Sequence, residues 1–196
     1  MLYKPTDMKK RILFIYGFGG SPDSTFCKLI REALPADRYE VLCPAYPQDD
    51  IKTSREQLTA FIEQEHIDLV IGTSLGGFIA LSLPTHLPCI ALNPCMMPSV
   101  ELPKLEPRPD HPEDKKPCKE LVEACKAIEA EVNNGKFNTS QRCVGLFAQD
   151  DEYLGTKYKE GFERAYHAAR FIPGGHHGNP KAIPSIVAAI EQTLSE

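Results

Sequence analysis

Several classes of protein are excluded by what this sequence lacks. No apolar run approaches the roughly 20 residues that a membrane-spanning helix needs. The longest apolar run near the N-terminus, Ile12 to Tyr16, is too short for the apolar region of a signal peptide and leads into glycines without a cleavage-type site. Positive charge is not in excess, because 22 Lys and Arg residues stand against 27 Asp and Glu residues. The net charge of −5 argues against nucleic acid or an anionic membrane as the main partner.

The signatures of disulfide frameworks and bound cofactors are also missing. The seven cysteines are odd in number and none has C-x-x-C spacing. Cys43, Cys89 and Cys143 lie in apolar runs, as expected for buried thiols in the reducing cytoplasm. The sequence has no H-E-x-x-H metal motif, no G-x-x-x-x-G-K-[ST] phosphate loop, and no G-x-G-x-x-G followed by an acidic ribose partner. We therefore expect neither a metal nor an organic cofactor.

The remaining composition is that of one ordinary globular domain. Of the 196 residues, 42% are hydrophobic and 25% are charged. A domain of this length buries about 70% of the surface that its unfolded chain exposes, so its core needs no disulfide or metal. No internal repeat or second core is visible. We predict a single domain, residues 1–196, in a cytoplasmic protein that is a monomer or a homodimer.

Short β-rich runs alternate with helical periodicities along the chain. Strands are predicted at residues 11–16, 39–43, 68–71, 89–92, 142–147 and 169–172. Helices are predicted at residues 21–34, 51–62, 74–83, 118–132 and 156–166, and after the Asn179-Pro180 pair. This alternation predicts right-handed β-α-β crossovers and a mainly parallel sheet with helices on both faces. Ligands bind beyond the carboxyl ends of such strands, so the chemistry is expected just after these ends.

The third predicted strand leads into Gly72-Thr73-Ser74-Leu75-Gly76, which matches G-x-S-x-G. A strand that ends at the first glycine and a helix that begins at the serine form the setting of a nucleophile elbow. Such an elbow holds the serine in a strained conformation, and the residues two before and two after it must lack bulk. The alternative is a serine that only caps the helix beside two packing glycines.

A serine nucleophile needs a base, usually a histidine, which an acid orients. In hydrolases built on this kind of sheet, the order along the chain is nucleophile, acid, histidine. After Ser74, the fifth strand ends in Ala148-Gln149-Asp150-Asp151-Glu152 and the sixth ends in Gly174-Gly175-His176-His177-Gly178. Both segments lie where the order and the carboxyl-end rule require them. From the residues alone, Asp151 can instead be a helix cap and the two histidines can be solvated loop residues.

The oxyanion of a tetrahedral intermediate must meet preorganised N–H donors. Leu75, the residue after the nucleophile, supplies one backbone donor. The best candidate for the other is Phe18, in the glycine-rich loop Gly17-Phe18-Gly19-Gly20 that follows the first strand. A phosphate-binding loop is the competing interpretation of these glycines, and the missing phosphate motifs disfavour it.

At these motifs the chain resembles the small single-domain YqiA/YcfP-like esterases of the α/β-hydrolase fold. The shared motifs are Tyr16-Gly17-Phe18 with Ser21-Pro22, Ala45-Tyr46-Pro47, Gly72 to Gly77, Asn93-Pro94 with Pro98, Asp151-Glu152 with Leu154, and Gly174 to His177. The family usually has histidine where Tyr16 stands. The resemblance implies a three-layer fold with about six mainly parallel strands in the order 2-1-3-4-5-6. It also implies that Asp151 is the acid and that His177 is the base.

The stretch between Pro84 and Pro117 holds nine of the 17 prolines. Proline fixes φ and removes a backbone donor, so this stretch is predicted to be irregular surface chain. We expect residues 94–117 to form a small cap over the pocket, with Met96 and Met97 as an adaptable apolar wall. Tyr46 is expected to contact the substrate as well. A cap of this size favours a short or modest acyl group.

Together these features predict a serine hydrolase that cleaves small-molecule carboxylic esters through an acyl-serine intermediate. Two alternatives remain: an acyl-coenzyme A thioesterase with the same triad, and a non-catalytic binding protein that keeps the pocket. A metal hydrolase that uses Asp150, Asp151, His176 and His177 is disfavoured, because adjacent side chains diverge.

Overall fold

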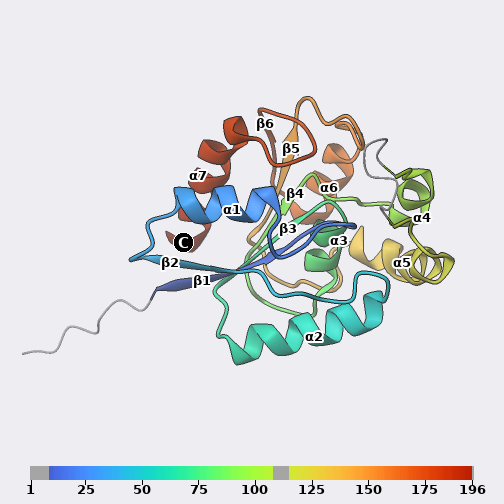
Figure 1. Cartoon of the computed structure of the whole chain (residues 1–196), viewed down its shortest axis with the longest axis horizontal. Helices are drawn as coiled ribbons and strands as arrows, with labels where there is room; N and C mark the ends of the chain where they lie inside the picture. The colour runs from blue at the N-terminus through green and yellow to red at the C-terminus, as the bar shows by residue number, and fades with distance from the viewer. Residues whose placement is uncertain (1–8, 108–114, 196) are drawn as a thin grey trace, which may run out of the picture.

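A six-stranded parallel sheet forms the centre of the protein (Figure 1). The computed structural model describes residues 9–107 and 115–195. The strands are β1 (Lys10–Ile15), β2 (Tyr39–Leu42), β3 (Leu69–Thr73), β4 (Cys89–Leu92), β5 (Cys143–Ala148) and β6 (Ala169–Ile172). They pair in parallel in the order β2-β1-β3-β4-β5-β6. This confirms the strand order that the family resemblance implied.

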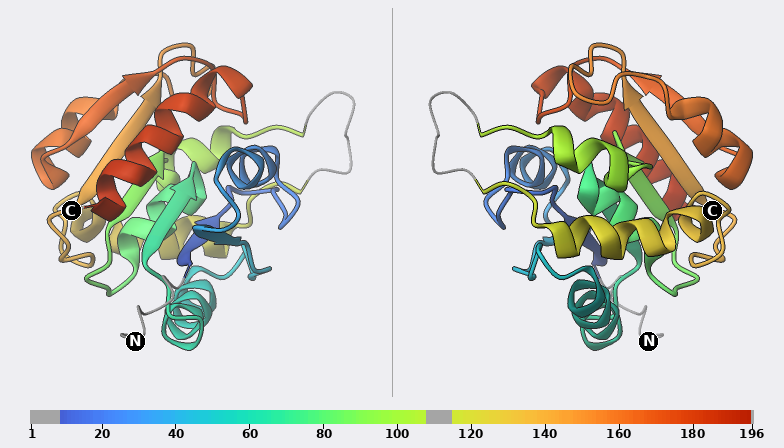
Figure 2. Two further views of the ribbon diagram at one scale, coloured as in Figure 1. Left: turned by 90° about the vertical axis from the view of Figure 1, so that its left-hand side faces the viewer. Right: turned by 90° about the vertical axis from the view of Figure 1, so that its right-hand side faces the viewer.

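Helices cover both faces of the sheet and complete the three predicted layers (Figure 2). On one face α1 (Thr25–Ala33) packs against α7 (Ile183–Ser195). On the other face α2 (Ile51–Gln64), α3 (Leu75–Ser82) and α5 (Lys119–Val132) pack against one another. The remaining long helix, α6 (Lys159–Tyr166), packs on β5 and β6. None of the helices in the described part of the chain is long and apolar enough to cross a membrane.

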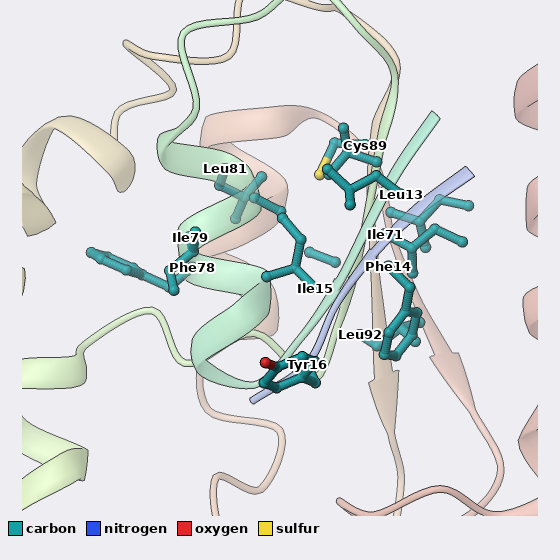
Figure 3. Close-up of a cluster of buried hydrophobic side chains, with 14 of the residues drawn as sticks. Leu13, Phe14, Ile15, Tyr16, Ile71, Phe78, Ile79, Leu81, Cys89 and Leu92 are labelled. Carbon is teal, nitrogen blue, oxygen red and sulfur yellow. The ribbon is translucent and has the colours of Figure 1, made fainter. Parts of the chain in front are cut away.

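The core is formed where β1 and β3 meet α3 (Figure 3). Every residue of β3 is buried, and so are the last four residues of β1. Successive strand side chains point to opposite faces, so Ile15 points toward α3 while Phe14 points away from it. All residues of α3 are buried as well, as expected for a helix that is apolar on every side. The turn between β3 and α3 therefore rests on two fully packed elements.

Several element boundaries differ from the prediction for identifiable reasons. The helix predicted from residue 21 begins at Thr25, because the side chain of Ser24, rather than Ser21, caps it by accepting from Cys27 N–H. Strand β3 continues through Thr73, two residues beyond the predicted end. The proline-rich stretch is not wholly irregular, since it contains α4 (Pro98–Glu101) and the 3-10 helix η1 (Leu102–Lys104). Pro98 is the first residue of α4 and Pro103 is the second residue of η1, and a proline is compatible with both positions because the first backbone N–H groups of a helix have no partner within it. Residues 108–114 of the predicted cap lie outside the described residues.

Candidate active site

Ser74 occupies the turn between β3 and α3 in a backbone conformation that is rare for a residue with a side chain. Its φ is 54° and its ψ is −122°. Such a conformation costs on the order of 1–3 kcal/mol and is kept only where the surroundings enforce it. Here Ser74 N–H donates to the carbonyl of Leu92, while the Ser74 carbonyl accepts from the N–H groups of Gly77 and Cys95. The Ser74 side chain does not cap α3. The geometry is therefore that of a nucleophile elbow rather than of a capping serine.

The glycines around Ser74 are required by close backbone contacts. A Cβ atom added to Gly72 would lie 2.2 Å from the carbonyl oxygen of Gly76. A Cβ atom added to Gly76 would lie 2.2 Å from the carbonyl oxygen of Ile15 and 2.4 Å from that of Tyr16. These neighbours are backbone atoms and cannot rotate away. Helix α3 thus lies this close to β1 because Gly76 lacks a side chain, and the turn from β3 into α3 is this tight because Gly72 lacks one.

We expect the Gly76→Ala variant to lose about 3 kcal/mol or more of its free energy of unfolding, because the added methyl group forces α3 away from β1. Urea denaturation measures this loss. Gly161→Ala in α6 is the matched control: its added methyl group would find only the Arg164 side chain, 3.8 Å away. That variant should stay within about 1 kcal/mol of the wild type. A wild-type urea midpoint for Gly76→Ala would contradict the close approach of α3 to β1.

Asp151, just beyond the end of β5, is held as an ionised carboxylate. Its side chain is 1% exposed. Its Oδ1 accepts from the N–H groups of Tyr153 (2.9 Å) and Leu154 (2.8 Å), and its Oδ2 lies 2.9 Å from Nδ1 of His176. Burial alone raises the pKa of Asp151, but the bond to His176 and the two backbone bonds outweigh it and leave this pKa below its usual value. An ionised acid fixes the histidine tautomer with its proton on Nδ1.

The histidine whose ring contacts Asp151 is His176, whereas the family resemblance assigned the base to His177. Both histidines line the same cavity as Ser74. The side chain of His176 is 10% exposed, and its backbone N–H donates to Oε2 of Glu152 at 3.0 Å. The ring of Tyr153 lies 5.1 Å from the ring of His176 and 5.3 Å from that of His177. Residues 151–153 thus hold the backbone and ring of His176 from one side.

Asn93, which follows β4, fastens the histidine loop from the other side. It is 1% exposed and has a positive φ of 42°, a conformation that asparagine tolerates better than most residues. Its Oδ1 accepts from Ala148 N–H at 2.7 Å, and its Nδ2 donates to the carbonyls of Gly175 (3.3 Å) and His176 (3.4 Å). The sequence placed Asn93 in a family motif without a role. The feature of the sequence that indicates a role for Asn93 is a polar side chain at the carboxyl end of a central strand.

The loop after β1 lies beside Ser74. The Gly20 N–H donates to the Gly17 carbonyl at 3.0 Å, which closes a tight turn with Phe18 and Gly19 at its centre. Gly19 has a φ of 74°, which suits the third position of a type II turn. A Cβ atom on Gly17 would lie 3.0 Å from Cβ of Ser74, so the loop touches the elbow. Leu75 is the first residue of α3, where backbone N–H groups have no partner within the helix.

A cavity of about 480 Å³ opens at this edge of the sheet. Its walls come from the elbow, the loop after β1, the start of α1, the histidine loop and the proline-rich segment, among them Phe18, Ser74, Leu102, Leu105, Tyr153 and His176. Tyr153, 47% exposed, is the most accessible aromatic side chain among them. The three residues predicted to contact substrate are not among the lining residues. Tyr46 packs on Tyr16, Met96 is buried in the core, and the sulfur of Met97 accepts from Asn133.

Glu101 of α4 connects the proline-rich segment to the loop that carries Asp151. Its Oε1 accepts from Lys157 Nζ at 2.7 Å and from the Tyr158 hydroxyl at 2.5 Å, and its Oε2 accepts from Lys104 Nζ at 3.1 Å. Burial raises the pKa of Glu101, but these three hydrogen bonds and the charge of Lys157 outweigh it and lower the pKa to about 2. The carboxylate is therefore ionised at neutral pH, and it holds α4, at the wall of the cavity, against Lys157 and Tyr158.

Among residues 9–107 and 115–195, no three His, Cys, Asp or Glu side chains are placed to hold a metal ion together.

The sequence itself matches one family model, described as "Uncharacterised protein family (UPF0227)", over residues 11–188. The chain belongs to this family. The match confirms the resemblance to the YqiA/YcfP-like proteins that the motifs indicated. No curated protein sequence matches the chain.

Solved structures of esterases and lipases have the same fold at low sequence identity. Est1E from Butyrivibrio proteoclasticus superposes with a TM-score of 0.75 and 15% identity, over 97% of this chain and 90% of that protein. The structure of the same protein with ferulic acid bound gives a TM-score of 0.73 and 14% identity, over 97% and 90% of the two chains. The monoacylglycerol lipase of Paleococcus ferrophilus gives 0.70 and 14%, over 94% of each chain. The protein therefore has the α/β-hydrolase fold.

Proposed function

We propose that the protein is a serine hydrolase that cleaves carboxylic esters through an acyl-serine intermediate. The observation that carries the proposal is the pair of Asp151 and His176, 2.9 Å apart, on the same cavity as a serine held in an elbow. An acid–histidine pair beside a strained serine is the arrangement that makes a hydroxyl nucleophilic. The esterases and lipases of the same fold support this class of reaction.

Asp151 and His176 have distinct roles in the proposed mechanism. Asp151 accepts a hydrogen bond from the protonated Nδ1 of His176. The other ring nitrogen, Nε2, then carries no proton and can take one from the Ser74 hydroxyl. The serine oxygen then attacks the ester carbonyl, and the Nε2 proton passes to the departing alcohol. Water, deprotonated by the same nitrogen, releases the acid from Ser74. Asp151 stays ionised throughout and stabilises the imidazolium that forms in each half-reaction.

Phe18 and Leu75 are proposed to supply the backbone N–H groups that receive the oxyanion. Phe18 is at the centre of the turn whose first residue touches Ser74, and Leu75 follows Ser74 directly. The substrate group is proposed to lie between Phe18, Leu102 and Leu105, which give this cavity an apolar wall. Est1E has been solved with ferulic acid bound, so an aromatic acyl group belongs among the substrates to be tested.

The purified protein tests the proposal directly. We expect it to hydrolyse nitrophenyl esters of increasing acyl length, with a preference set by the cavity of about 480 Å³, and to react covalently with a fluorophosphonate probe. Methyl ferulate tests an aromatic acyl group, and matched oxygen and sulfur esters of one acyl chain separate an esterase from a thioesterase. A protein that neither turns over these esters nor reacts with the probe is a binding protein, and the proposal is then wrong.

A further inference from the structure

The loop that would stabilise the oxyanion has a composition that works against a fixed conformation. Gly17, Gly19 and Gly20 surround Phe18, and glycine loses more backbone freedom on ordering than any other residue. An oxyanion donor contributes to catalysis only if it is already in position when the charge develops. The turn bond from Gly20 N–H to the Gly17 carbonyl closes the loop on itself but does not fix it relative to the sheet.

The side chain of Gln48, from the loop after β2, supplies an external attachment. Its Oε1 accepts from Gly19 N–H at 2.7 Å, and its Nε2 donates to the Gly20 carbonyl at 2.8 Å. Both ends of one planar amide are therefore bonded to two consecutive residues of the turn. Both bonds are short for N–H···O hydrogen bonds. Gly19, the residue that follows Phe18, is thus held by a side chain from a different loop.

The same segment also holds the beginning of the loop. The hydroxyl of Tyr46 donates to the Tyr16 carbonyl, and the Tyr46 N–H donates to the Tyr16 hydroxyl at 3.4 Å. Residues 46–48 are anchored in turn, because the Pro47 carbonyl accepts from the Ser54 hydroxyl of α2 at 2.6 Å. The loop after β1 is thereby connected at both ends, through Tyr46 and Gln48, to the segment that Ser54 fastens to α2.

We propose that Gln48 is a positioning residue that preorganises the Phe18 N–H for the oxyanion. The proposal rests on the proposed esterase function. Gln48 lies outside the residues that line the cavity, so it acts through the loop and not on the substrate. Its removal should therefore weaken binding of the tetrahedral transition state and leave binding of the ground-state ester nearly unchanged.

The test compares Gln48→Met, which keeps the length of the side chain without its hydrogen bonds, with Gln48→Glu, which keeps only the acceptor for Gly19 N–H. We expect Gln48→Met to lower kcat for a nitrophenyl ester by about 10- to 100-fold, with KM changed by less than about threefold. Inhibition by a trifluoromethyl ketone, whose adduct carries the oxyanion, should weaken by a similar factor. Gln48→Glu should be at least as impaired, since a carboxylate oxygen then faces the Gly20 carbonyl. Lys52→Met, which changes an exposed residue, is the control variant. It should keep the wild-type kcat, KM and ketone affinity.

Each outcome decides the proposal. A merely structural role predicts a lower urea midpoint with kcat and ketone affinity unchanged for the folded fraction, and that result overturns the role of Gln48. Equal loss of ester binding and turnover overturns it too, because the effect would then not be specific to the transition state. A wild-type protein without turnover or probe labelling overturns the proposed function, and this role with it. If the wild type is active and the Gln48→Met variant is equally active, the role of Gln48 is overturned and the proposed function is not.

Discussion

The Ser74→Ala variant should fail to react with a fluorophosphonate probe and should hydrolyse nitrophenyl esters at least about 10⁴-fold more slowly than the wild type. The reason is that the Ser74 hydroxyl is the proposed nucleophile on the cavity that also holds His176, and alanine leaves the proposed base without a proton to remove. Binding and oxyanion donors remain, so a small residual rate above that of water is expected. Labelling is read by in-gel fluorescence, and turnover by nitrophenol release.

The matched control for this variant is Ser21→Ala, which removes an exposed hydroxyl from the loop before α1. It should label and turn over at wild-type rates. Persistent labelling of Ser74→Ala would contradict the assignment of the nucleophile and would direct attention to another side chain of the cavity.

The His176→Asn variant should lose about 10³- to 10⁴-fold in kcat, whereas His177→Asn should lose less than about tenfold. Asparagine keeps a polar side chain of similar reach but cannot carry a proton from serine to leaving group. The difference follows from the contacts of the two side chains, because the ring of His176 is the one that contacts Asp151. Single-turnover measurement with a nitrophenyl ester gives the acylation rate of each variant.

Tyr153→Leu serves as a control for this pair, since it removes the ring that touches both histidines but keeps the backbone bond to Asp151. It should affect the two imidazoles alike and lower kcat far less than His176→Asn. The reverse order, with His177→Asn inactive and His176→Asn active, would return the base to the residue that the family resemblance chose. The loop would then have to rearrange on binding substrate.

Most of the fold followed from patterns that are local in the sequence. The apolar strands and the helical periodicities gave all six strands and the main helices, and β4 and β6 were predicted at their observed bounds. The misplaced start of α1 has a local cause as well. Ser21-Pro22 and Ser24 both fit a helix start, and only the bond from Cys27 N–H to Ser24 decides between them. Two neighbouring capping signals cannot be ranked by sequence alone.

The sequence located the loops that surround the cavity, whereas the roles of individual side chains in the proposed site stay predictions. Ser74 and Asp151 each follow the end of a predicted strand and each belong to a recognised motif, so two independent signals agree on them. The structure brings both residues to one edge of the sheet. His176 and His177 share every signal in the sequence, and only the direction of each ring separates them, since the two ring planes stand at 86° to each other. That direction depends on Asn93 and Glu152, which bind the loop from distant parts of the chain. Contacts of such long sequence separation leave no pattern in a single sequence.

Two carboxylates fasten the proline-rich segment to other parts of the fold. Glu101 attaches it to Lys157 and Tyr158, and Glu129 of α5 attaches it by accepting from the backbone and hydroxyl of Ser99. Neither attachment passes through Ser74, and the elements that they fasten, α4 and η1, follow β4 and precede α5 along the chain. We therefore expect changes in the length of this connection to alter the wall of the cavity that Leu102 and Leu105 form, and to leave the backbone contacts of Ser74 in place.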